Sequence, residues 1–329
     1  MNIAELSAAT DEVSDYQTID KQTAFIALDH LCAYRVSGDD AKSFLQGQLS
    51  NDLEKTTPAA ATLNAYCTPK GRMLAIFYLV QWQQDYIMIL SADTAAAVVQ
   101  RLTMYVMRAK VVFEQVDDAQ LFGIADPHGA LINQVCAGRA PERPYQSVSD
   151  EHTLCMRAPA ETARYIILSR QTLDLNQLPH DVVCRQAYWL YLDIINGIPS
   201  LCEALKEAFV PQMANMELID GVSFKKGCYP GQEVVARLHY LGNSNRRMFQ
   251  FSCACPPTIA AGDDIHDATT QRVVGKVVSA VKQPHTSLGL AIIHIASVKT
   301  DHLTLHDTAL SILTLPYAVP LEEAAEKKL

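Results

Sequence analysis

The chain has 329 residues, of which 49% are hydrophobic and 19% charged, and this composition is typical of a globular protein with two or three packed units. Its formal net charge is −9. Because nucleic-acid binding depends on neutralising phosphates, we expect no strong direct binding to RNA or DNA. The nine cysteines are odd in number and irregularly spaced, which indicates a reducing compartment.

The N-terminal segment argues against export. Its first twenty residues carry five acidic side chains and no Lys or Arg, whereas secretory signals and transit peptides are basic. The longest apolar run, residues 73–80, is shorter than the roughly 20 residues that span a bilayer. We therefore predict a cytoplasmic protein without a membrane partner.

Regular structure is predicted to begin at Phe25, after a polar extension over residues 1–24. Residues 25–38 are expected to form two paired strands, and the apolar spacing within 41–53 predicts a helix. The elements predicted further along are a three-stranded antiparallel system over 62–91, a helix over 93–104, strands near 111–116, 121–126 and 163–169, and a helix over 185–197. This order predicts an α+β fold with helices packed on antiparallel sheets.

The sequence changes character beyond Gly242, where short apolar runs alternate with turn residues. Such spacing indicates a small all-β module. The divisions predicted for the whole chain are the extension at 1–24, a main region of two subdomains at 25–240, a small β-barrel at 241–319 and a charged tail at 320–329.

Several enzyme signatures are missing from the sequence. It contains no P-loop motif, no GxGxxG after a predicted strand, no GxSxG and no HExxH. The corresponding nucleotide-binding, hydrolase and metalloprotease classes are therefore disfavoured.

The segment FKKGCYPGQEVVAR at 224–237 is the densest in chemistry-bearing residues. Its Pro-Gly pair fits the central positions of a type II turn, which would project Cys228 and Tyr229 outward. Nearby lysines and a helix N-terminus lower the pKa of a thiol, so Cys228, beside Lys225 and Lys226, is the candidate reactive cysteine. The alternative is that Cys228 fills space under a tight turn.

Two other features allow a structural and a functional interpretation. Trp189, one of two tryptophans, lies among tyrosines on a predicted helix, where it could pack in the core or stack on a planar heterocycle. Cys253 and Cys255 could bind a metal or occupy alternate positions of a strand. Without further ligands at zinc-site spacing we predict no metal.

The sequence KGCYPGQE closely resembles the KGCYxGQE motif of the YgfZ family, relatives of the glycine-cleavage T-protein, an aminomethyltransferase. Further matches lie at 36–52, 65–74, 189–199 and 209–224. The resemblance implies T-protein-like folate-binding domains followed by a small C-terminal β-barrel. It also implies tetrahydrofolate or a derivative as cofactor. The partners it implies are iron–sulfur enzymes, including those that thiolate tRNA, which gives an indirect link to tRNA.

The resemblance also assigns site residues. Cys228 and Lys226 are expected to carry whatever thiol chemistry occurs. The predicted folate-binding residues are Trp189, Leu31, Tyr229, Gln232, Glu233 and Arg237, where Leu31 occupies the place of a second tryptophan found in some members.

Two departures from the T-protein bear on activity. Leu74 and Ala75 stand where the resemblance places catalytic acids, and Ile195 stands in place of the glutamate that anchors the pterin. An alkyl group cannot orient folate or move a proton. We therefore expect a folate-binding accessory protein and lean against an enzyme; the alternatives are a one-carbon transferase using Asp193 or Glu217, and a non-catalytic interaction protein.

Overall fold

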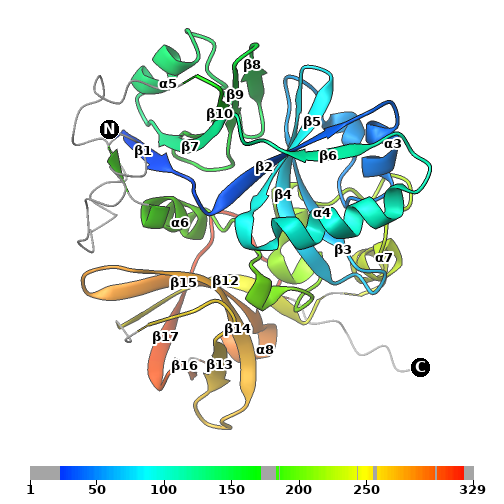
Figure 1. The fold of residues 1–329 in the computed structure, drawn as a ribbon. Helices are drawn as coiled ribbons and strands as arrows, with labels where there is room; N and C mark the ends of the chain where they lie inside the picture. The colour runs from blue at the N-terminus through cyan, green and yellow to red at the C-terminus, as the bar shows by residue number, and fades with distance from the viewer. Residues whose placement is uncertain are drawn as a thin grey trace.

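The computed structural model describes residues 23–171, 183–184, 186–242, 244–254, 258–300 and 302–321. These residues form two sheets and a closed barrel, with the barrel below the two sheets in Figure 1. No helix in the described part of the chain is both long and apolar enough to cross a membrane.

The first unit is a five-stranded sheet in the order β3-β4-β5-β2-β6. Its elements are β2 (Leu31–Ser37), α3 (Ala41–Gln46), the 3-10 turn η1 (Leu53–Lys55), β3 (Thr62–Cys67), β4 (Met73–Trp82), β5 (Asp85–Ser91), α4 (Ala92–Val106) and β6 (Val112–Gln115). Side chains alternate along β5, so that Ile87 and Ile89 face one core while Met88 and Leu90 face another, beneath α4. The sheet is thus buried on both faces.

The second unit is a six-stranded sheet in the order β11-β1-β7-β10-β9-β8. Its elements are β1 (Ala24–Ala27), β7 (Gln120–Ala125), α5 (Ala130–Val135), β8 (Ser147–Ser149), β9 (Thr153–Arg157), β10 (Arg164–Ser169) and β11 (Val183–Cys184). Strand β1 pairs in parallel with β11 and antiparallel with β7.

The third unit is a closed barrel in the order β12-β15-β14-β13-β16-β17. Its elements are β12 (Arg246–Ala254), β13 (Asp264–Asp267), β14 (Val273–Lys282), β15 (Thr286–His294), α8 (Ile295–Val298), β16 (Leu303–Leu305) and β17 (Thr308–Leu313). The predicted C-terminal barrel is therefore confirmed, with its first strand a few residues after the expected boundary.

Helix α6 (Gln186–Ile195) lies between the units and contacts β1 of the six-stranded sheet and β14 and β15 of the barrel (Figure 1). It is followed by three 3-10 turns, η3 (Glu203–Leu205), η4 (Pro211–Ala214) and η5 (Met216–Ile219), and by α7 (Gln232–Tyr240). Because α6 is covered on several sides, Tyr188, Trp189 and Leu192 are all buried.

The sequence-based elements agree with the structure in most places. The three strands over 62–91 and the helices at 93–104 and 185–197 are present. The pairing expected within 25–38 is wrong, because β1 and β2 belong to different sheets. The helix expected over 41–53 is also shorter: α3 ends at Gln46, and a 3-10 turn begins at Leu53.

Candidate functional site

A cavity of about 80 Å³, called here the Trp189 cavity, lies between the five-stranded sheet and α6. Trp189 of α6 and Leu31 of β2 both line it, together with the middle of β4 and the end of β5. Two of the six residues predicted to bind folate thus face the same space. Strand β7 approaches the indole through Gly123, where a Cβ atom would lie 2.6 Å from Trp189 Cε3.

The indole is held by a buried charge pair. The guanidinium carbon of Arg164 lies 4.8 Å from the centre of the Trp189 ring, within cation–π range. Arg164 Nη1 also lies 2.7 Å from Asp193 Oδ1, and Asp193 stands four residues after Trp189 on α6 and lines the cavity. Desolvation by burial raises the pKa of Asp193, while the neighbouring Arg164 opposes that shift.

His30 contributes a polar side chain to the cavity. Its side chain lines the space, and its buried Nδ1 has no hydrogen-bond partner within the described residues. Burial lowers the pKa of His30 to about 4, so the imidazole is neutral near pH 7. A neutral imidazole can accept or donate one hydrogen bond to a ligand.

The turn within the segment that carries the cysteine motif forms as sequence analysis predicted. The Gln232 amide donates to the Tyr229 carbonyl at 3.1 Å, and Gly231 has φ +83° and ψ 1°, which are the values of a type II turn. A Cβ atom on Gly231 would lie 2.6 Å from the Gly71 Cα. This turn therefore packs directly on the Pro69-Lys70-Gly71 hairpin turn, and only glycine fits.

Cys228 lies exposed at this turn. It is the exposed member of the seven cysteines whose side chains the structure describes. Tyr229, in contrast, is 6% exposed, so the expectation that both side chains project outward is wrong for Tyr229. Burial raises the pKa of the Tyr229 phenol.

The Lys226 ammonium points into the protein. Its Nζ donates to the carbonyl oxygens of Gln46, Leu49 and Asn51 at 2.6, 2.6 and 2.9 Å, which accounts for its three protons. Burial lowers the pKa of Lys226 to about 8, while the three carbonyls favour the charged form. These bonds connect the motif to the end of α3 and the segment that follows it. They use all three protons of the ammonium group, so Lys226 donates no hydrogen bond to the Cys228 sulfur.

The remaining predicted folate residues lie apart from the Trp189 cavity. Gln232 is half-buried, with its Nε2 3.4 Å from the Lys226 carbonyl, and Glu233 and Arg237 are exposed on α7. Figure 1 shows α7 at the right of the molecule and α6 at the left. The predicted site therefore occupies two places: the Trp189 cavity and the turn at Cys228.

The two alkyl residues that stand where the resemblance places catalytic acids are buried. Leu74 and Ala75 are 3% and 1% exposed in the core beneath α4. Of the two substitute acids considered, Asp193 lines the cavity, whereas Glu217 forms a buried ion pair with Arg247. Sequence reasoning missed Arg164 and His30, although an arginine opening an apolar strand at 164–169 was a signal of a buried charge.

The fold as a whole defines the class of protein. The aminomethyltransferase of the glycine cleavage system from Bartonella henselae aligns with 92% of this chain and 88% of its own, at a TM-score of 0.70 and 14% identity. The chain therefore has the aminomethyltransferase fold.

Sequence comparison narrows this class. No protein-family model matches the chain. The tRNA-modifying protein YgfZ of Edwardsiella ictaluri is 29% identical over 309 residues, which cover 90% of this chain and 93% of that protein. An uncharacterized protein from Haemophilus influenzae is 31% identical over 261 residues, covering 78% and 84%. The chain belongs to the YgfZ family.

Proposed function

We propose that this protein binds a reduced folate at the Trp189 cavity and supports tRNA modification in the cytoplasm through iron–sulfur enzymes, with Cys228 as its reactive thiol. One observation carries the proposal: Trp189 and Leu31, from α6 and β2, line one cavity beside the Arg164–Asp193 pair. Small-molecule sites combine such apolar walls with a few convergent polar groups.

The polar and aromatic groups at the cavity suit the pterin ring of a folate. A pterin presents adjacent N–H donors along one edge, and the Asp193 carboxylate can accept them, as the charge-assisted bonds of carboxylates do. Trp189 supplies an aromatic surface, and Arg164 fixes both side chains. Tetrahydrofolate, when bound, would supply one-carbon chemistry or a regulatory signal; the protein's residues supply orientation and exclude water.

The free volume of about 80 Å³ is below the roughly 300 Å³ of ordinary ligand pockets. Entry of a bicyclic ring therefore requires one wall to move. Leu31 is half-buried and forms the wall between this cavity and a larger hollow on the far side of β2. We infer that displacement of Leu31 opens the cavity to the ring.

The link to tRNA rests on the relatives named as tRNA-modifying proteins and is indirect for this chain, since its net charge of −9 opposes binding to a polyanion. The exposed thiol of Cys228 is the group best placed to meet a partner enzyme. Aminomethyl transfer is not proposed, because Leu74 and Ala75 provide no group that moves a proton.

Tryptophan fluorescence tests the folate half of the proposal. The chain has two tryptophans, so Trp82→Phe leaves Trp189 as the sole reporter and Trp189→Phe leaves Trp82 as the matched control. Titration with tetrahydrofolate should quench Trp82→Phe in a saturable way and leave Trp189→Phe unchanged. Equal quenching of the two variants, or none in either, would remove the cavity from consideration.

Cell-based measurement tests the thiol half. In cells that depend on this protein, Cys228→Ser should lower the methylthiolated fraction of tRNA nucleosides, measured by mass spectrometry. Cys202→Ser, a change at a half-buried free cysteine, is the control and should retain it. Full retention by Cys228→Ser at equal protein levels would favour the non-catalytic interaction protein instead.

A further inference from the structure

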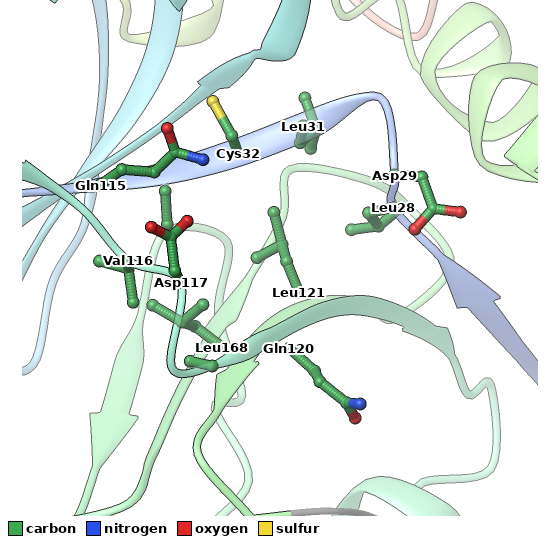
Figure 2. A pocket seen from close by; sticks show the side chains of 12 residues that line it. Leu28, Asp29, Leu31, Cys32, Gln115, Val116, Asp117, Gln120, Leu121 and Leu168 are labelled. Atoms are coloured by element: carbon green, nitrogen blue, oxygen red, sulfur yellow. The ribbon is translucent and has the colours of Figure 1, made fainter. Parts of the chain in front are cut away.

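A groove of about 360 Å³ lies on the other side of Leu31 from the Trp189 cavity. Its walls are the start of β2 and the connection between β6 and β7 (Figure 2). Leu28, Ala33 and Leu168 form a floor that is at most 4% exposed. This volume lies within the roughly 300–1,000 Å³ of small-molecule sites, and the floor is apolar.

The charge of this groove is wholly negative. Asp29 and Asp117 line it, and no Lys, Arg or His does so among the described residues. No ion pair within the described part of the chain neutralises either carboxylate, whereas the neighbouring Asp118 is paired with Arg170 at 2.9 Å. Opposite charges attract and like charges repel at these distances, so the groove favours a cation and disfavours an anion.

The polar groups meet at one end of the groove. Figure 2 shows Asp117, Gln115 and Cys32 close together above the apolar floor. The Tyr34 hydroxyl donates to Gln115 Oε1 at 3.1 Å, which orients the amide. Burial raises the pKa of Cys32 to about 11, so this thiol stays neutral and adds no charge.

We infer that this groove binds a small amphipathic amine, whose protonated amino group lies at Asp117 and whose apolar body covers the leucine floor. The inference goes beyond the proposed folate site, because the anionic glutamate tail of a folate is repelled by Asp29 and Asp117. Leu31 separates the two spaces, so an amine in the groove would lie beside a ligand of the Trp189 cavity.

Calorimetric titration with three probes of similar size tests the inference. Phenethylamine carries the cation, phenethyl alcohol is neutral and 3-phenylpropionate is an anion. Phenethylamine should bind most tightly, by about fivefold over the alcohol as expected for one exposed ion pair, and 3-phenylpropionate should not bind. Added salt should weaken amine binding, because it screens exposed charges.

Two carboxylate variants locate the site. Asp117→Asn should weaken phenethylamine binding about fivefold, whereas Asp118→Asn, at a carboxylate outside the groove, should leave it unchanged. In amide NMR spectra, phenethylamine should shift the signals of Ala33 and Ala119, which line the groove. Equal affinity for the three probes, equal effects of the two variants, or shifts elsewhere would overturn the inference.

Folate titration of the same proteins separates the two ideas. Asp117→Asn should bind tetrahydrofolate as the unmodified chain does, because Asp117 does not line the Trp189 cavity. Loss of amine binding with folate binding intact supports the groove. Folate binding without any amine binding refutes the groove alone, and amine binding without folate binding refutes only the proposed function.

Discussion

The Nζ atom of Lys226 lies 2.6 Å from the carbonyl oxygen of Leu49, a residue 177 positions earlier in the chain. Replacing Lys226 by methionine keeps the apolar stem but removes the donor to three carbonyls. Unsatisfied buried acceptors each cost roughly 1–3 kcal/mol, so Lys226→Met should lower the free energy of unfolding by about 2–4 kcal/mol. Urea denaturation measures this change.

The neighbouring lysine supplies the matched control. Lys225 is exposed, so Lys225→Met should change stability by less than about 0.5 kcal/mol. Alkylation of Cys228 by iodoacetamide adds a second measurement: if Lys226 positions the turn, replacing Lys226 alters the rate at which Cys228 is alkylated. Equal stability of the two variants would contradict a structural role for Lys226.

The Arg164–Asp193 pair should show strong energetic coupling. Arg164 is 1% exposed, and removing one partner of a buried pair leaves an uncompensated charge, at a cost of about 3–5 kcal/mol. Arg164→Met should therefore be severely destabilising. The double variant Arg164→Met with Asp193→Asn should recover part of the loss, and strictly additive effects in urea unfolding would speak against the coupling.

His30 should make the protein sensitive to acid. Its folded pKa of about 4 is below the ordinary value of 6.5, so between those two pH values the unfolded chain binds a proton that the folded chain does not. Stability is thus lost as pH falls through this window and is unaffected by His30 above it. At 1.36 kcal/mol per pKa unit the loss is at most about 3 kcal/mol, and less because the side chain is half-buried.

The variant His30→Gln isolates this contribution. Its stability should fall less steeply than that of the unmodified chain between pH 6.5 and 4, in urea denaturation at several pH values. His128→Gln, at an exposed histidine, should follow the unmodified chain. Parallel pH profiles for all three proteins would show that His30 does not carry the effect.

Gly123→Ala should disturb the Trp189 cavity, because Gly123 packs against the indole ring. The added Cβ would lie 2.6 Å from Trp189 Cε3, so the indole or the strand must move, which costs about 1–3 kcal/mol. In a Trp82→Phe background the emission of Trp189 should shift and folate affinity should fall. Gly242→Ala adds a Cβ in open space and should change neither; identical spectra for the two variants would refute the prediction.

The parts of the fold that sequence predicted are those governed by local pattern. The turn at Pro230-Gly231 follows from residue types within a few positions, whereas the sequence left open whether Gln232 begins a helix or a strand. Strand pairing does not follow from local pattern, because β1 and β2 are separated by three residues yet join different sheets. A two-residue alternation identifies a strand but carries no information about its partner.

The candidate site likewise has features that the sequence predicted and features that it did not. Trp189 and Leu31, both predicted from the resemblance, line one cavity, and Asp193 could be found from its spacing of four residues on one helix. The environment of Arg164 and the bonds of Lys226 depend on contacts between segments far apart in the sequence. Composition near Cys228 predicted a cationic neighbour for the thiol, but the direction of the Lys226 side chain is decided by carbonyls contributed from the other half of the chain.

The contact between the turns at Gly71 and Gly231 has a consequence for the order of events during synthesis. The hairpin strands emerge from the ribosome early, but the carbonyls that Lys226 satisfies must remain hydrated until more than 170 further residues have been added. Closing so long a loop comes late in folding. The turn that displays Cys228 is therefore fixed only after residue 226 has been added, and only a chain whose two halves have docked presents its thiol in this geometry.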